Sequence, residues 1–303
     1  FHRPRSCASP PELACFVRTM PDDDYEMATL YEYAEETEKW EKESVKVRMD
    51  ERPFDEGAHR VCYKVRLRTS RDEAVMVAKI YKAKQEPSAY FNTALTQMIA
   101  NGYAEEFNRL GTRREIKFVP VFVLKLHERD GILVNLEPYL AGKYIKHNDN
   151  DGNVDSQDMI PHAFSHFTWE RSERKLLICD IQGVGDLYTD PAIQTVKGDA
   201  SIFGEGNFGL DAVHKFFASH ECNAVCRAHG LQPAHRERRV LEKQMQEEEE
   251  SVQRCASSHP TVAATSPRSP QSARSRDRHT WASSDLDAGE SEEKGRGGKE
   301  QVK

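Results

Sequence analysis

The sequence predicts an α+β fold arranged in two lobes, and three observations support this prediction. Residues 40–81 alternate apolar and polar side chains with a period of two, which is typical of half-buried antiparallel strands. Residues 90–110 carry apolar side chains at helical spacing. The short apolar run over residues 176–181 is bounded by charged residues and glycine, which is typical of a buried strand in a second lobe.

Composition and charge argue against several classes of protein. The 303 residues are enough for one large domain or two small ones. The formal net charge of -7 argues against a dedicated nucleic-acid binder, which usually has an excess of basic residues. The seven cysteines follow no regular spacing, which argues against a secreted disulfide scaffold. No apolar run approaches the roughly 18 residues that span a bilayer. We therefore expect a soluble cytoplasmic protein without a membrane span.

The two ends of the chain differ from its middle in composition. The chain begins at Phe1 with neither a Met nor an apolar signal segment, so we expect a fragment of a longer protein. Residues 1–39 are predicted as a partly disordered leader, in which a short helix over residues 25–39 is conceivable. Residues 234–303 are predicted as a charged, low-complexity tail, with a solvated helix over residues 235–254 and disorder from Cys255 onward.

The predicted first lobe covers residues 40–136. Its strands are expected over residues 45–49, 61–67, 74–81, 118–126 and 132–137, around the helix at 90–110. Lys79 is unusual because it is an ammonium group inside an apolar run, and an unpaired buried charge is costly. It either faces an anionic partner or phosphate, or it lies on the solvated face of an edge strand. Glu105 and Glu106 are the candidate carboxylate partners on the helix.

The predicted second lobe covers residues 137–233 and contains the most informative stretch of the chain. Its first residues, 137–140, end a strand abruptly, as a hinge does, and residues 143–154 are predicted as a flexible polar loop. Asp180 follows the buried strand, and Gly183 and Gly185 permit a sharp turn. The oxygen atoms of Gln182 and Asp190 would then suit Mg²⁺, which prefers such ligands. The alternative is a polar turn after a core strand.

A glycine-rich segment over residues 204–209 matches the pattern G-x-G-x-x-G. A dinucleotide fingerprint should follow the first strand of a βαβ unit, whereas this segment comes late and after the polar residues 196–201. A Rossmann fold is therefore disfavoured. A glycine loop that leads into a helix over residues 211–219 can still bind an anion through backbone N–H groups.

His220, Cys222 and Cys226 provide three potential metal ligands within seven residues. The two cysteines are four residues apart, so one helical face can present both. A tetrahedral structural zinc site needs a fourth ligand, for which His162 and His166 are upstream candidates. The alternative is a pair of buried free thiols near a surface histidine.

Residues 40–231 contain a series of ordered motifs: Gly57-Ala58-His59-Arg60, Val77-Ala78-Lys79, Glu137-Pro138-Tyr139-Leu140-Ala141-Gly142, Ala163-Phe164-Ser165-His166-Phe167-Thr168, Asp180-Ile181-Gln182-Gly183-Val184-Gly185-Asp186, Thr189-Asp190-Pro191, Gly206-Asn207-Phe208-Gly209 and His220-x-Cys222-x-x-x-Cys226. In their order and spacing these motifs resemble those of the alpha-kinases, which are atypical serine/threonine protein kinases. Within that family, the chain looks more similar to elongation factor 2 kinase and the myosin heavy chain kinases.

The resemblance implies a two-lobed atypical kinase fold with a structural zinc in the second lobe, and ATP, Mg²⁺ and Zn²⁺ as cofactors. The sequence has none of the His-Arg-Asp, Asp-Phe-Gly and Ala-Pro-Glu signatures of ordinary protein kinases. The catalytic residues implied are Asp180, Lys79, Lys146 and Gln182. The residues implied for nucleotide and phosphate are Lys79, Glu137, Leu140, Asn150, Asp190, Gly204, Gly206, Asn207 and Gly209. The metal ligands implied are His166, His220, Cys222 and Cys226 for zinc, and Gln182 and Asp190 for the magnesium and phosphate region.

The function implied is transfer of the ATP γ-phosphate to serine or threonine of a protein, with elongation factor 2 and myosin heavy chain as candidate substrates. Two alternatives stay open: a catalytically inactive, zinc-stabilised pseudokinase or interaction module, and a kinase of small molecules. The glycine loop at residues 204–209 could contact nucleotide or peptide. The leader contains no convincing basic amphipathic helix, so the sequence does not support calmodulin as a partner.

Overall fold

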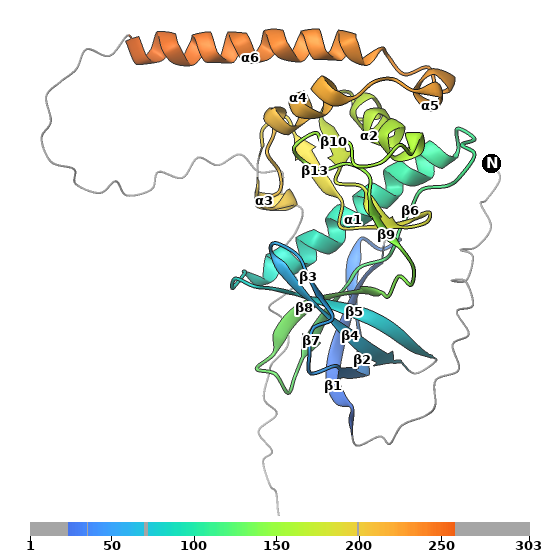
Figure 1. The fold of residues 1–303 in the computed structure, drawn as a ribbon. Helices are drawn as coiled ribbons and strands as arrows, with labels where there is room; N and C mark the ends of the chain where they lie inside the picture. Colours follow the sequence, from blue (N-terminus) through green and yellow to red (C-terminus); the bar gives the residue numbers. More distant parts are fainter. Residues whose placement is uncertain (1–23, 35, 70–71, 199, 258–303) are drawn as a thin grey trace, which may run out of the picture. The chain divides into compact units, whose positions relative to one another are not determined.

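The computed structural model describes residues 24–34, 36–69, 72–198 and 200–257 (Figure 1). Contacts divide the chain into two units, residues 1–253 and 254–303, and every strand lies in the first. The expected disorder of residues 1–23 and 258–303 lies outside the described residues. Among the helices of the described ranges, none has the length and apolar character needed to cross a membrane.

The first lobe is built on a sheet that closes into a barrel. Its strands are β1 (Glu26–Ala34), β2 (Lys39–Met49), β3 (Asp55–Glu56), β4 (Arg60–Arg68), β5 (Glu73–Tyr81), β7 (Phe122–Leu126) and β8 (Ile132–Pro138). They are hydrogen-bonded in the order β2-β1-β7-β8-β5-β4-β3, and an additional pairing of β2 with β4 closes six of them on each other. Every second side chain points inward, and residues such as Val47, Val65 and Leu136 fill the interior.

Strand β1 corrects the suggestion of a helix over residues 25–39. The segment is rich in Glu and Ala, which favour helices, but Ala28 and Leu30 are buried while their neighbours are more exposed. It pairs with β2 on one side and with β7 on the other. Glu26 is buried at its start, where Arg129 Nε donates a hydrogen bond of 2.7 Å to Glu26 Oε1. Tertiary pairing therefore overrides local propensity here.

The helix α1 (Pro87–Asn108) runs from the barrel into the second lobe (Figure 1). Pro87 occupies its first turn, where a missing N–H removes no hydrogen bond. Near its start, Phe91 packs in a buried cluster with Val123 of the barrel. Near its end, the Phe107 ring contacts the Phe164 ring edge-on at 5.6 Å. The predicted helix over residues 90–110 is thus confirmed, and it packs on both lobes.

The second lobe contains two small sheets and several helices. Its elements are β6 (Lys117–Phe118), β9 (Tyr144–Lys146), α2 (Met159–Arg171), β10 (Leu176–Cys179), β11 (Gln182–Val184), β12 (Leu187–Thr189), β13 (Ala192–Thr195), α3 (Ala200–Phe203), α4 (Leu210–Ser219), α5 (Ala224–Ala228) and α6 (Ala234–Ser257). One sheet has the order β6-β12-β11-β9, and β10 pairs with β13 in the other. The turn between β11 and β12 has Gly185 at a φ of 62°, as the glycine pattern predicted.

Two predicted segments differ in detail from the structure. The strand expected over residues 118–126 is interrupted at Pro120, which cannot donate to a ladder, and forms β6 and β7. The polar loop expected over residues 143–154 contains strand β9, which pairs with β11, so that prediction was wrong for its first part. All three residues of this strand are exposed at the edge of its sheet, so it has no buried face that would distinguish it from a loop.

Helix α2 has no counterpart in the expectations from the sequence. Its residues from Ile160 to Trp169 are all buried, so the helix lacks the polar face by which an amphipathic helix is recognised. Pro161 also argues against a helix when the sequence alone is considered, although proline is tolerated in a first helical turn. Asp158 caps the helix by accepting a hydrogen bond of 3.2 Å from Ile160 N.

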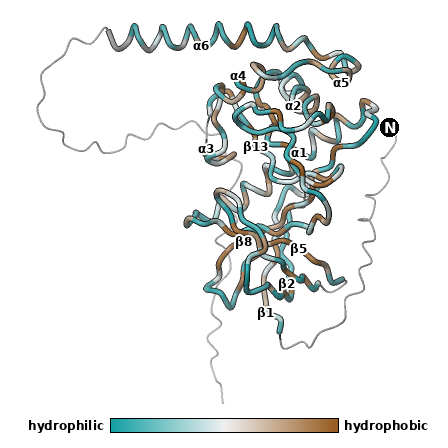
Figure 2. The backbone as a smooth tube through the Cα atoms, viewed as in Figure 1, coloured by the Kyte–Doolittle hydropathy of each residue, from teal (hydrophilic) through white to brown (hydrophobic). Residues whose placement is uncertain are grey.

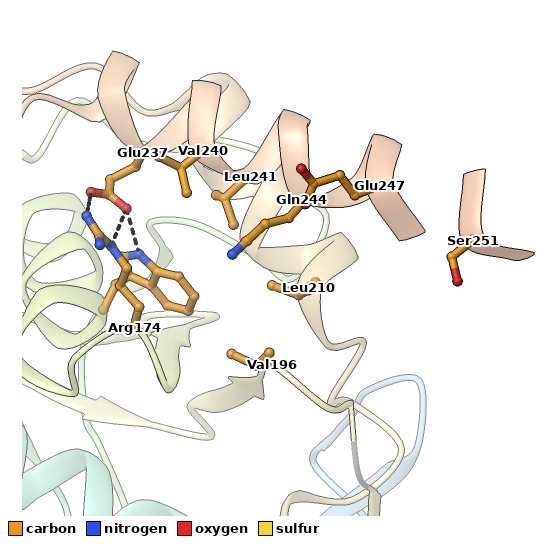
Figure 3. Close-up of a pocket in the computed structure, with 10 residues that line it drawn as sticks. Arg174, Val196, Leu210, Glu237, Val240, Leu241, Gln244, Glu247 and Ser251 are labelled. Atoms are coloured by element: carbon orange, nitrogen blue, oxygen red, sulfur yellow. Dashed lines mark hydrogen bonds and ion pairs between the residues drawn. The ribbon is translucent and has the colours of Figure 1, made fainter. Parts of the chain in front are cut away.

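Helix α6 confirms the predicted helix over residues 235–254, but its first turns are not merely solvated. Figure 2 shows a largely hydrophilic helix with isolated apolar residues. Leu241 and Glu237 are buried against the second lobe. Glu237 accepts hydrogen bonds from Arg174 and from Trp169 Nε1, as Figure 3 shows. A cavity of about 630 Å³ lies beside this helix, and its lining includes none of the predicted site residues.

Candidate functional site

Lys79 is the centre of a buried ion cluster at the end of the barrel. Its side chain leaves β5 on the outer face, because Met76 and Ala78 point into the barrel. Lys79 Nζ lies 2.7 Å from Glu137 Oε1, and it also contacts Asp190 Oδ2 and, at 3.3 Å, Thr189 Oγ1. Burial alone would lower the pKa of Lys79, but the carboxylates of Asp190 and Glu137 reverse this effect and raise it. Lys79 therefore remains a cation although it is only 6% exposed.

The partner of Lys79 is not on helix α1, which corrects the expectation of Glu105 or Glu106. Asn101 Nδ2 donates a hydrogen bond of 3.1 Å to Glu105, and Arg171 pairs with Glu106 at the surface. The ion pair instead uses Glu137, which lies on β8, the strand that pairs with β5 beside Lys79. A sequence pattern indicates which charge needs a partner, but the partner is chosen by strand order.

Asp190 joins the two lobes electrostatically. Its Oδ1 lies 3.1 Å from Arg60 on β4, and its other oxygen contacts Lys79 on β5. Its backbone N–H donates to Gln97 Oε1 of α1 at 3.0 Å. Burial favours the neutral form, but the two cations outweigh it and lower the pKa of Asp190 to about 2. Arg60 and Gln97 had no assigned role in the sequence analysis, although Arg60 belongs to one of the motifs.

Asp180 lies just beyond the end of β10, where the buried strand was predicted to stop. Its backbone has a φ of 58°, which only a few non-glycine residues adopt. The next residue is held on both sides: Ile181 N donates to Asn148 Oδ1 at 3.0 Å, and Ile181 O accepts from His147 N at 2.8 Å. Lys146 Nζ lies 2.7 Å from Asp180 Oδ1. Asn148 thus acts as a buried positioning residue that the sequence analysis did not identify.

The groups around Lys79 and Asp180 form one site. Burial raises the pKa of Asp180, the Lys146 ammonium offsets part of this, and the charge of Asp190 raises it further. The Tyr144 hydroxyl, whose pKa is raised mainly by burial, is also affected by Asp190 and Asp180. Gln182 lies opposite Lys146 of β9 and opposite Thr189 of β12, so the ion pair of Lys146 with Asp180 lies near the contact of Lys79 with Asp190. The resemblance implied this grouping, and the catalytic roles of these residues stay predictions.

Oxygen atoms suited to a hard cation surround this site. Gln182 Nε2 donates to Asp190 O at 3.4 Å, which places the Gln182 amide beside Asp190. Asn150 Oδ1 is buried and has no hydrogen-bond partner among the described residues. Asp190, Gln182 and Asn150 together offer carboxylate and amide oxygens, the donors that Mg²⁺ prefers. The residues present therefore fit the ion that the sequence implied.

The expected hinge is the end of β8. The Glu137 side chain forms an ion pair with Lys79. It also accepts a hydrogen bond of 2.6 Å from Thr189 Oγ1 at its Oε2. Leu140 follows the strand and is half-buried. The rings of Tyr139 and Phe54 meet edge-on at 5.9 Å, and Lys64 lies over both. A backbone contact of this segment with adenine stays a prediction.

The glycine loop is fixed to β13 by its own side chains. Asn207 Oδ1 accepts from Thr195 N at 2.9 Å, and Gln194 Nε2 donates to Gly206 O at 2.9 Å. Gly209 has a φ of 68° and precedes α4. A Cβ built on Gly206 would lie 3.8 Å from Asn150 Nδ2, so the loop adjoins one residue of the site. Asn207 Nδ2 also donates to Thr195 Oγ1 at 2.8 Å. Contacts of Gly204, Gly206, Asn207 and Gly209 with nucleotide stay predictions.

Substitution of Lys79 by methionine is expected to destabilise the protein by about 3 kcal/mol, because Glu137 would lose its buried cation and Asp190 would keep only Arg60. Phosphoryl transfer should fall by about 100-fold if the ammonium stabilises charge on the phosphates. Urea unfolding and a radiolabelled transfer assay measure the two effects. The double variant K79M/E137Q should recover stability but not activity. An unaltered unfolding midpoint in K79M would contradict the assignment of this ion cluster.

A second cluster lies at the far side of α2. His166, His220, Cys222 and Cys226 place one ligand atom each within 4.8 Å of one another. Cys222 Sγ lies 3.8 Å from His166 Nδ1, and Cys226 Sγ lies 3.6 Å from His220 Nε2. Zinc bonds of about 2.0–2.3 Å in a tetrahedron separate the ligand atoms by roughly 3.3–3.8 Å. The donor set suits Zn²⁺, and these two distances match such a tetrahedron, within a cluster whose ligand atoms lie up to 4.8 Å apart. Binding of zinc stays a prediction.

His166, and not His162, places a ring nitrogen in this cluster. His162 Nε2 is occupied by the Ser156 carbonyl at 2.9 Å. His166 Nε2, on the opposite side of the ring from Cys222, lies 3.2 Å from Glu170 Oε1. A carboxylate behind a histidine is a common support of metal sites, because it orients the ring. Ala234 N also donates to Cys222 Sγ at 3.2 Å, so the start of α6 is attached to the cluster.

Comparisons with known proteins point to one group of similar sequences. The profile of the Alpha-kinase family matches residues 55–226. Eukaryotic elongation factor 2 kinase from Rattus norvegicus is 40% identical over 218 residues, which are 69% of this chain and 30% of that protein. The alpha-kinase domain of myosin-II heavy chain kinase A in complex with AMP-PNP has a TM-score of 0.65 and 32% identity. That match covers 71% of this chain and 98% of the domain. This chain thus spans less than a third of the length of the elongation factor 2 kinase that it matches.

Proposed function

The chain belongs to the alpha-kinase family, and from this premise we propose that it transfers the γ-phosphate of ATP to serine or threonine hydroxyls of a protein. The observation that carries the proposal is the shared site of Lys79, Asp190, Asp180 and Lys146. The similar myosin kinase domain binds AMP-PNP, an ATP analogue, which supports ATP as the donor here.

Each residue of the site has a physical task in this reaction. Phosphoryl transfer depends mostly on positioning and on stabilising the charge that spreads over the transferred oxygens. Lys79, fixed by Glu137 and Asp190, would donate to phosphate oxygens, and Lys146 would face the transferred group. Asp180 would accept the proton of the attacking hydroxyl, and its raised pKa makes it a stronger base than an ordinary aspartate.

Magnesium and zinc have separate places in the proposal. Mg²⁺, when bound, would neutralise charge on the phosphates, and Asp190, Gln182 and Asn150 would hold it. Zn²⁺, when bound to His166, His220, Cys222 and Cys226, would join α2 to the segment after α4. These ligands enclose the sequence that carries Asp180 and Asp190, so the zinc cluster would stabilise the fold around the catalytic carboxylates.

A transfer assay with mass-spectrometric mapping of the modified residues tests the proposal. The protein is incubated with Mg²⁺-ATP and with elongation factor 2, myosin heavy chain or no added substrate. The expected result is phosphoserine or phosphothreonine on one of these proteins or on the chain itself. Nucleotide binding without transfer would instead favour the pseudokinase alternative. Transfer to free sugars or amino acids, with none to protein, would favour a kinase of small molecules.

A further inference from the structure

We infer that the protein substrate docks as an extra strand on the outer edge of β9, and this inference rests on the proposed kinase function. Strand β9 is the last strand of the sheet β6-β12-β11-β9, and no described strand pairs with the outer edge of Tyr144–Lys146. The open stretch ends there, because Asp155 N donates to His147 O at 2.9 Å and Val154 is bridged to Asn148. All three of its residues are exposed, including 49% of Tyr144 and 36% of Ile145. A free edge of this kind is a template for an extended peptide.

The register of β9 shows which backbone groups are available. Lys146 lies opposite Gln182 and Ile145 opposite Gly183 in the antiparallel ladder. His147 N donates inward to Ile181 O at 2.8 Å. Inward and outward groups alternate along such a ladder, so the N–H and C=O of Ile145 face β11. Those of Tyr144 and Lys146 therefore point to the outer edge.

The same alternation places substrate side chains near the catalytic aspartate. Side chains of Tyr144 and Lys146 lie on one face of β9, and Lys146 reaches Asp180 at 2.7 Å. Residues directly opposite in paired strands have Cβ atoms about 5 Å apart. A substrate residue paired with Lys146 would thus have its side chain on the face of Asp180. Serine or threonine at that position would present its hydroxyl to the general base.

Pairing with an edge predicts a preference for an extended segment over a helix or a folded surface. Main-chain hydrogen bonds to Tyr144 and Lys146 would supply affinity that is independent of sequence. The residue two positions from the acceptor, on one side, would pair with Tyr144. In an antiparallel pairing, substrate residues one or three positions from the acceptor in sequence would point their N–H groups away from β9.

A matched pair of variants tests the docking strand on the protein side. Proline at position 144 removes the outward backbone N–H without breaking a hydrogen bond to β11. Alanine keeps this N–H, and both variants lack the tyrosine ring, so they differ in the backbone donor. Using the phosphopeptide site mapped in the transfer assay as the substrate sequence, KM for the peptide should be about tenfold higher for Y144P than for Y144A. KM for ATP should be equal in the two. Equal peptide KM in two active variants would overturn the inference.

Backbone methylation tests the same inference on the peptide side. N-methyl groups are placed one or two residues from the acceptor, on either side. N-methylation two residues from the acceptor, on the side that pairs with Tyr144, should raise KM for the peptide about tenfold. N-methylation of the residues next to the acceptor should have little effect. Equal sensitivity at all four positions would show that the peptide binds elsewhere. If the parent protein transfers no phosphate to any protein, the proposed function itself fails. If it transfers phosphate but the N-methyl groups do not show this dependence on position, only the docking strand fails.

Discussion

Substitution of Asp180 by asparagine is expected to lower phosphoryl transfer by about 10³-fold, because asparagine cannot accept the proton of the attacking hydroxyl. Asparagine keeps the shape of the side chain and tolerates the φ of 58° at this position better than most residues. Binding of Mg²⁺-nucleotide and the unfolding midpoint should change little. Initial rates with a mapped peptide substrate provide the measurement.

The pH profile gives an independent check on the same carboxylate. Burial raises the pKa of Asp180, so its ionised form is lost as pH falls through a value above the ordinary aspartate pKa of about 3.9. The parent rate should therefore decline on the acid side of that raised pKa, and the residual rate of D180N should lack this limb. A D180N protein as active as the parent would place the general base elsewhere.

Replacement of both Cys222 and Cys226 by serine is expected to abolish the folded state rather than to slow the enzyme. Structural zinc binding contributes about 10 kcal/mol or more in small zinc domains, which is comparable with the whole stability of an ordinary domain. The parent protein should contain one zinc per chain by plasma mass spectrometry. The double variant should lose the metal and its cooperative unfolding transition by circular dichroism.

A cysteine outside the cluster supplies the control. Cys62 lies on β4 and is a half-buried free thiol. C62S should keep one zinc per chain and a cooperative transition close to that of the parent. A stable, metal-free parent protein, or a zinc content that the double substitution does not alter, would show that the cluster is a set of buried thiols and imidazoles only.

Most strands of the first lobe could be predicted because each has one buried and one outer face, whereas β1 and β3 were not among the expected strands. Val45 and Val47 alternate with polar residues, and the same period recurs in β4. The position of Asp180 also followed from the sequence, because an apolar run that ends in a carboxylate and glycine marks the end of a buried strand. Lys79 was identified by the cost of burying its charge.

Other features depended on contacts between distant parts of the chain. Helix α2 is buried on all sides, so no periodic pattern distinguished it. The pairing of Lys79 with Glu137 depends on the adjacency of β5 and β8, which are more than fifty residues apart in sequence. Asn148 and Gln97 support the site through single hydrogen bonds to backbone atoms. A local pattern contains no information about such long-range partners.

Closure of the barrel has a mechanical consequence for the whole catalytic cycle. Each of its six strands is hydrogen-bonded on both sides, since β2 pairs with β4 as well as with β1. Sliding one strand past another would break two ladders at once, so the barrel should move as a rigid body. Nucleotide entry and release would then be accommodated by torsional changes in residues 138–143 and by tilting of α1, rather than by separation of paired strands in the barrel.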